Sequence, residues 1–301
     1  MDYVTLGKSG LVSSVIGLGG GSSGRFGLTK GGSKADAIRL IRSALDLGIT
    51  LFDGAGICGG VDELLAEGLG KYRADVLLCT KFHLGPDVYS GAKFTNRASH
   101  WSARRFGWVC TASTIRRRVE QTLKALRTDR IDLLHLHAVT PRQYPLAADR
   151  VLPELARLKS EGKLRAIGVT EGFVSDPRHQ MLRLAVEDAR VDAVMSGFNF
   201  ANPSAADQVI PWAQSAGIGV IGMFALRGLL GSSSEVRRLA EEAGAASLSD
   251  LAYRYARHQP GMDAVLTGTG DPEHLKQNVA AALAPPLPQA VLDRLKALAS
   301  A

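Results

Sequence analysis

Three predominantly apolar runs each end in one ionisable residue, and this pattern limits the fold more than any other feature of the chain. The runs are 49–52 before Asp53, 76–80 before Lys81, and 131–136 before His137. Buried parallel strands read as continuous apolar runs, and an enzyme barrel carries its chemistry where those strands end. The three ionisable side chains are therefore predicted to meet in one pocket.

Strand-like and helix-like segments alternate along the chain, which favours a parallel sheet. Segments 2–5 and 12–15 predict a hairpin that precedes the alternation and could plug one end of a barrel. Eight strand–helix units follow, so the count favours an α/β fold of the (β/α)8 TIM-barrel type over a doubly wound sheet. The glycine run 17–21 matches a dinucleotide-binding turn poorly, because Ser22 breaks its pattern and no helix follows directly.

Hydrophobic spacing and end signals set the expected element boundaries. The expected helices are 33–48, 63–71, 113–126, 152–160, 178–188, 205–216 and 247–257. Four further strands are expected at 166–169, from 193 onward, at 219–223 and at 264–267. The third strand is followed by a long connection, 84–110, and a connection of that length more often contacts substrate than serves only as a link.

Length and composition favour one barrel domain over residues 1–301. The chain is 46% apolar, and neither a Pro/Ser/Gly linker nor a block of like charge divides it. No apolar stretch reaches the roughly 18 residues of a membrane span. Met1-Asp2-Tyr3 carries an acid where a signal peptide needs a basic region, so a cytoplasmic protein is expected. The three cysteines form no CxxC pair, which indicates reduced thiols and no metal site.

The net charge of +7 does not indicate a nucleic-acid-binding protein. Basic residues are spread over many predicted helices, and the one local cluster, Arg116-Arg117-Arg118, lies beside Glu120 without interleaved aromatic residues. We interpret the cluster as a solvated helix face. A small-molecule substrate is therefore expected, whereas the sequence does not indicate an oligomeric state.

Several segments together resemble the aldo-keto reductase family, in order and over nearly the whole chain. They are 1–11, Gly48-Ile-Thr-Leu-Phe-Asp53, Cys79-Thr-Lys81, Asp129 to His137, 162–170, 217–221 and 266–278. Gly168-Val-Thr-Glu171 and Met223-Phe-Ala-Leu-Arg227 resemble one bacterial branch. The resemblance implies a (β/α)8 barrel that binds NADPH and transfers a hydride to an aldehyde or ketone.

The family uses four catalytic residues, and this chain matches three of them. Asp53, Lys81 and His137 correspond to the aspartate, the lysine that it pairs with, and the histidine that orients the carbonyl. The family pattern places a tyrosine acid five residues after the aspartate, whereas this chain has Cys58 there. The site is therefore predicted to have an altered acid position.

A cysteine at this position changes the acid chemistry. The free pKa values of tyrosine and cysteine are about 10 and 8.5, and a nearby ammonium favours either anion, so the thiol would be largely thiolate. A thiolate cannot donate a proton to a developing alkoxide. Loss of general acid catalysis costs roughly 10²- to 10⁴-fold in rate. The expected proton sources are His137, Tyr89, or a water held by Lys81 and Cys58, in that order.

The resemblance also implies a set of cofactor-binding positions, with NADP favoured and NAD open. They are Thr170, Glu171, Asn199, Phe224, Arg227, Thr269, His274, Gln277 and Asn278. Glu171 and Asn199 are expected near the nicotinamide amide, and Phe224 is the expected stacking platform. The last four positions surround the adenosine end, where a helix N-terminus favours a 2′-phosphate. The basic residue often found before that helix is replaced by Gly270.

Other interpretations remain open at this point. Asp53 and Lys81 could be a structural ion pair, His135 competes with His137 on the same strand face, and Cys58 could be a small buried filler. On the same barrel, a redox-neutral lyase, isomerase or dehydratase could use Cys58, His137 and Lys81. A non-catalytic cofactor-binding protein is a third possibility. Aromatic residues in and beside 84–110 suggest a bulky or aromatic substrate.

Overall fold

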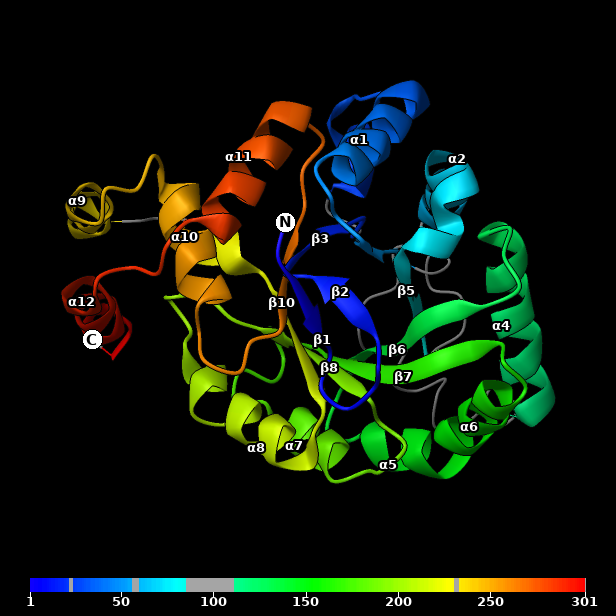
Figure 1. Ribbon diagram of the computed structural model, residues 1–301. Coiled ribbons are helices and arrows are strands. Elements are labelled where there is room, and N and C mark those ends of the chain that lie inside the picture. Colours follow the sequence, from blue (N-terminus) through cyan, green and yellow to red (C-terminus); the bar gives the residue numbers. More distant parts are fainter. Residues whose placement is uncertain (22–23, 56–59, 85–110, 230–232, 301) are drawn as a thin grey trace.

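Eight parallel strands close into a barrel in the computed structural model, which describes residues 1–21, 24–55, 60–84, 111–229 and 233–300. Around the barrel the order is β10-β3-β4-β5-β6-β7-β8-β9. The strands are β3 (Ile16–Gly19), β4 (Leu51–Asp53), β5 (Leu77–Phe82), β6 (Ile131–Val139), β7 (Leu164–Glu171), β8 (Ala193–Gly197), β9 (Gly219–Met223) and β10 (Ala264–Thr267). The (β/α)8 prediction is confirmed (Figure 1).

The predicted N-terminal hairpin is also confirmed. β1 (Tyr3–Thr5) and β2 (Val12–Ser14) pair antiparallel, and Figure 1 shows them across the near end of the barrel. Leu6 and Leu11, in the turn between them, are fully or almost fully buried in the same cluster as inward-facing strand residues such as Leu51. The turn therefore closes this end of the barrel with apolar side chains.

Helices surround the barrel and lie close to the expected ranges. They are α1 (Lys34–Asp46), α2 (Val61–Leu69), α4 (Ala112–Ala125), α5 (Tyr144–Leu146), α6 (Leu152–Ser160), α7 (Gln180–Val186), α8 (Val209–Ala216), α9 (Ser234–Glu242), α10 (Leu248–Arg257), α11 (Pro272–Leu283) and α12 (Gln289–Ser300). Shorter helical turns, including η1 (Arg25–Lys30), connect them. The predicted start of α1 is confirmed, because Ser33 and Asp36 form a reciprocal capping box.

The first barrel strand, β3, lies inside the glycine run 17–21. A Cβ atom at Gly17 would lie 2.6 Å from the Leu51 side chain, so glycine there lets β3 and β4 pack closely. Helices α9 and α12 lie to one side of the barrel in Figure 1 and contact each other through the Arg294 pairs with Glu235 and Glu242. Neither helix was among those expected from the sequence.

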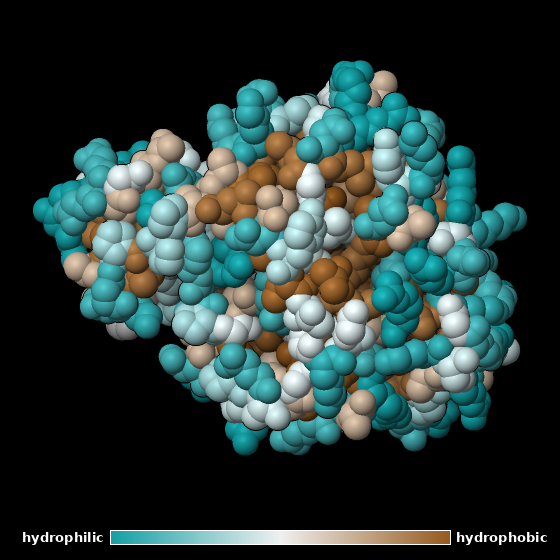
Figure 2. All heavy atoms as spheres, viewed as in Figure 1, coloured by the Kyte–Doolittle hydropathy of each residue, from teal (hydrophilic) through white to brown (hydrophobic). Residues whose placement is uncertain are grey.

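Hydrophilic side chains predominate over the outer helices on the face seen in Figure 2, and hydrophobic side chains gather between them around the hairpin. This distribution agrees with an apolar layer between the strands and the helices. Within the part of the chain that the structure describes, no helix has the length and apolar character needed to cross a membrane.

Candidate active site

The barrel brings Asp53 and Lys81 into direct contact. Asp53 is the last residue of β4 and Lys81 lies near the end of β5, which pairs with it. The Lys81 ammonium donates a hydrogen bond to Asp53 Oδ1 and a second, 3.2 Å long, to the Gly54 carbonyl. Both side chains are more than nine-tenths buried. Among the described residues no third acceptor is recorded for Lys81, so its remaining N–H is available to a substrate oxygen.

Burial dominates the electrostatics of the carboxyl groups beside Lys81. It raises the pKa of Asp53, while the Lys81 ammonium acts in the opposite direction. Asp62, in the first turn of α2, is almost fully buried, and burial raises its pKa to about 7. Thr80 Oγ1 donates to the Asp62 carboxyl at 3.1 Å. A second buried carboxyl therefore lies behind the Asp53–Lys81 pair.

The two histidines of β6 differ in their surroundings. His135 is fully buried, neither of its ring nitrogens has a hydrogen-bond partner among the described residues, and it packs against Gly168. His137 lies two residues further toward the strand end and is partly exposed. Burial, followed by His83 and Lys81, lowers the pKa of His137 to about 3, so its ring is neutral. That His137, and not His135, faces substrate stays a prediction.

A residue missing from the predicted site, His83, contacts His137 directly. Their Nδ1 atoms are 3.0 Å apart and their rings meet nearly at right angles. The sequence contained a signal for this contact, since His83 lies two residues after Lys81. Alternate residues of an extended strand point to the same side.

Cys58, the residue predicted to replace the tyrosine acid, lies outside the described residues, as does Tyr89. The altered acid position therefore stays a prediction.

Thr170 and Glu171, predicted near the nicotinamide amide, are both buried and bound within the protein. Thr170 Oγ1 accepts a 2.8 Å hydrogen bond from the backbone N–H of Ala138, directly after His137. Glu171 Oε2 contacts His179 Nδ1 at 2.8 Å, and Glu171 Oε1 accepts a 2.7 Å bond from the Gly197 N–H. Both residues thus hold the ends of neighbouring strands in place, and their contact with a cofactor stays a prediction.

Asn199, after β8, contacts the segment after β9 that carries Phe224 and Arg227. Asn199 Nδ2 donates to the Phe224 carbonyl at 3.2 Å, and the Arg227 guanidinium lies 4.1 Å from the centre of the Phe224 ring. Phe224 has a left-handed backbone, with φ of 68°, and its ring is partly exposed. A non-glycine residue rarely adopts this conformation, so the bond from Asn199 helps to hold the ring in place.

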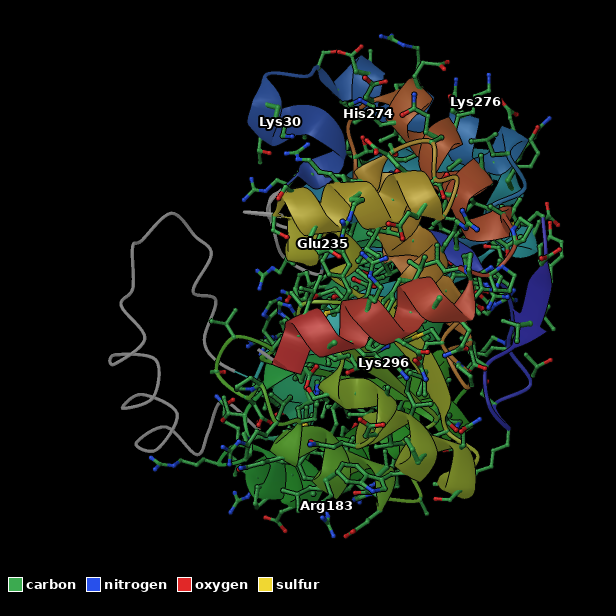
Figure 3. The ribbon with its side chains drawn as sticks, turned by 90° about the vertical axis from the view of Figure 1, so that its left-hand side faces the viewer. Lys30, Arg183, Glu235, His274, Lys276 and Lys296 are labelled. Atoms are coloured by element: carbon green, nitrogen blue, oxygen red, sulfur yellow. The ribbon has the colours of Figure 1, made fainter. Side chains whose placement is uncertain are left out.

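A cavity of about 450 Å³ lies between η1, α1 and the start of α11. Thr269 and His274, predicted for the adenosine end, line it together with Lys30 and Arg39, which were not predicted. Figure 3 shows Lys30 and His274 near each other at one edge of the molecule. The carboxylates of Asp36, which pairs with Arg39, and of Asp271 also line the cavity. Among the groups present, the Lys30 ammonium, the Thr269 hydroxyl and the His274 imidazole fit a phosphate and a ribose at the adenosine end of a dinucleotide.

Gly270 lets η1 pack closely against the turn before α11. A Cβ atom at Gly270 would lie 2.3 Å from the Gly27 Cα atom, so only glycine lets the two segments approach this closely. That approach places Lys30 in the cavity wall. No carboxylate is recorded in an ion pair with Lys30 in the described ranges, and the cation is available to an anion.

The remaining two predicted positions do not line this cavity. Gln277 is exposed further along α11. Asn278 is buried, and its amide donates a 2.9 Å bond to Thr267 Oγ1. Asn278 therefore ties α11 to β10 within the core, and a cofactor contact of either residue stays a prediction.

Comparisons with known proteins identify the family and the fold. A model of the Aldo/keto reductase family matches residues 15–300. L-galactose dehydrogenase of Arabidopsis thaliana is 27% identical, over 93% of this chain and 88% of that protein. A putative aldo-keto reductase of Pseudomonas aeruginosa has 29% identity and a TM-score of 0.70, covering 93% and 94% of the two chains. The holo form of an aldo-keto reductase from Bacillus halodurans has a TM-score of 0.78 at 23% identity, covering 99% and 96%, and shows the shared fold.

The family match spans nearly the whole chain, and the relatives are oxidoreductases and reductases. The chain therefore belongs to the aldo-keto reductase family of oxidoreductases.

Proposed function

We propose that the protein interconverts a small carbonyl compound and its alcohol with NADPH or NADH as the hydride carrier. The observation that carries this proposal is the buried Lys81–Asp53 pair at the barrel strand ends, with His137 close enough for the Lys81 charge to lower its pKa. A reduced nicotinamide, when bound, supplies the hydride. Lys81 donates to the substrate oxygen, and Asp53 holds the ammonium in position.

We further propose that Cys58 occupies the position of the usual acid and that His137 supplies the proton. A thiolate at Cys58 would have no proton to donate, whereas His137, whose pKa the Lys81 charge helps to lower, has a neutral ring. In the same proposal Phe224 stacks on the nicotinamide ring, while Lys30, Thr269 and His274 contact the adenosine end. The cationic Lys30 favours NADPH over NADH, since NADPH carries the additional phosphate.

Two observations suggest classes of substrate. The name of L-galactose dehydrogenase suggests aldoses, which present a masked aldehyde and several hydroxyl groups. The aromatic residues around 84–110 suggest a larger or aromatic carbonyl compound. Both classes belong in the first assay, with 4-nitrobenzaldehyde as a reactive aromatic probe and L-galactose as the sugar probe.

Two measurements test the proposed function. Tryptophan fluorescence titrated with NADPH and then NADH reports cofactor binding without knowledge of the substrate, and tighter binding of NADPH is expected. Consumption of reduced cofactor with each probe reports turnover. We expect Lys81→Met to lower the rate by about 10²-fold or more, and Lys124→Met, an exposed lysine on α4, to leave it unchanged. If neither NADPH nor NADH binds, the proposal is contradicted.

A further inference from the structure

The contact between His83 and His137 restricts where their protons lie. Two ring nitrogens at 3.0 Å can share one proton, because two bare lone pairs repel and two N–H groups clash. One Nδ1 atom is therefore the donor and the other is the acceptor. The near-perpendicular rings, with centres 4.3 Å apart, agree with a hydrogen bond rather than with stacking.

The other nitrogen of His83 indicates which way this bond runs. His83 Nε2 lies 3.4 Å from the Ala55 carbonyl, and because a carbonyl oxygen can only accept, a hydrogen bond between the two atoms requires the proton on Nε2. In the neutral pair, His83 Nδ1 is then the acceptor and His137 Nδ1–H donates to it. His137 Nε2 is left with a bare lone pair, which makes it a base toward a substrate hydroxyl.

One added proton reverses the arrangement without placing the charge on His137. His83 becomes the imidazolium, keeps Nε2–H toward Ala55, and donates Nδ1–H to His137. His137 stays neutral but now carries its proton on Nε2. In this form it is a donor toward a substrate oxygen. The pair therefore has an acid form and a base form that differ by one proton.

We propose that His83 loads and unloads the proton that His137 exchanges with substrate, so that the two histidines act as a relay in place of a phenol acid. The inference rests on the proposed function and extends it to the source of the proton. His83 acts through His137 and is a positioning residue, whereas His137 touches the substrate.

The proton balance closes in both directions. In reduction, a hydride adds to the carbonyl carbon, the carbonyl π electrons move to oxygen, and oxygen takes the proton from His137 Nε2. His137 Nδ1 takes the proton from His83 Nδ1, and the pair changes from the cation to the neutral form. In oxidation, His137 Nε2 takes the hydroxyl proton and His83 receives the proton from His137 Nδ1.

The titratable groups around the pair, within the described ranges, are few. Lys81 precedes His83 on β5, His135 precedes His137 on β6, and Asp53 on β4 pairs with Lys81. Asp62 lies behind Thr80.

Kinetics at varied pH test the relay, with 4-nitrobenzaldehyde and NADPH in one direction and 4-nitrobenzyl alcohol and NADP⁺ in the other. In the wild type, we expect reduction to slow and oxidation to accelerate as pH rises through one apparent pKa of the pair. His83→Gln can form a hydrogen bond but cannot exchange a proton. It should lower kcat by about 10²- to 10⁴-fold, change KM much less, and flatten both pH profiles over that range.

Rescue separates the relay from a structural role of His83. Added imidazole should restore part of the rate of His83→Ala, which leaves space for it, and none of the rate of His83→Gln. If the wild type is active and the His83 variants turn over at the same rate, the relay is overturned while the proposed function stands. An inactive wild type with both probe pairs would overturn the proposed function together with the relay.

Nitrogen NMR of ¹⁵N-histidine-labelled protein gives a readout that does not depend on turnover. In the neutral pair, we expect His137 to carry its proton on Nδ1, and we expect this preference to disappear in His83→Ala. A wild-type spectrum with the His137 proton fixed on Nε2 in the neutral pair would overturn the assignment.

Discussion

Replacing Asp62 with asparagine should change how the stability of the protein depends on pH. Burial raises the pKa of the Asp62 carboxyl from its ordinary value of 3.8 to about 7. The unfolded chain ionises near 3.8, whereas the folded chain holds the proton until about 7. The protonated Asp62 therefore makes its full contribution to the free energy of unfolding of the wild type below pH 3.8, and this contribution is lost as pH rises toward 7.

The size of this effect follows from the difference between the two pKa values. A difference of one in pKa corresponds to about 1.36 kcal/mol, so forcing the buried carboxyl to ionise costs the folded state about 4 kcal/mol. An asparagine amide has nearly the same shape, can accept the bond from Thr80, and does not ionise. In Asp62→Asn, residue 62 should therefore cause no loss in the free energy of unfolding as pH rises from 3.8 to 7.

Urea unfolding of both proteins at a series of pH values provides the measurement. The free energy of unfolding of the variant minus that of the wild type should rise by up to about 4 kcal/mol between pH 4 and pH 8. Other titrating groups, including Asp53, occur in both proteins and largely cancel in this difference. If the variant and the wild type differ by the same free energy of unfolding at pH 4 and at pH 8, then Asp62 is not held protonated by burial in the folded protein.

Three further substitutions probe the site. Asp53→Asn leaves the buried Lys81 ammonium without its counterion and should lower the free energy of unfolding by about 3–5 kcal/mol; unchanged urea unfolding would contradict a buried ion pair. Phe224→Ala removes the proposed stacking platform and should weaken NADPH binding by roughly 2- to 10-fold in the fluorescence titration, whereas Phe224→Tyr should retain it. Cys58→Tyr should raise the rate of reduction of simple aldehydes; an equal or lower rate with the fold intact would count against an ordinary reductase pocket.

The sequence predicts the strands that end near Asp53, Lys81 and His137 well, because burial on both faces leaves little choice of residue type. The runs before Asp53, Lys81 and His137 had to be apolar, and their ends had to lie at one rim of the barrel. Strand β3 was not assigned from the sequence, because its short run contains two glycines. Their role depends on the close approach of Leu51 from the neighbouring strand, which no local pattern encodes.

Contacts between distant segments account for the rest of what the sequence did not predict. Lys30 and His274 share a cavity only because β10 closes the barrel against β3. Glu171 contacts His179 because a short connection folds back and His179 adopts a left-handed backbone. The His83–His137 contact, by contrast, was within reach of sequence reasoning, since the period of two along a strand places His83 on the same side as Lys81.

An isotope experiment tests whether a hydride passes from a nicotinamide to a carbonyl carbon, which is the step that defines the proposed function. The protein is incubated with 4-nitrobenzaldehyde or L-galactose and with NADPH deuterated at C4 of the nicotinamide, in each stereochemical form, and the product alcohol is examined by mass spectrometry. We predict that one of the two forms delivers deuterium to the former carbonyl carbon. A protein that binds NADPH but transfers no deuterium from either form would contradict the account.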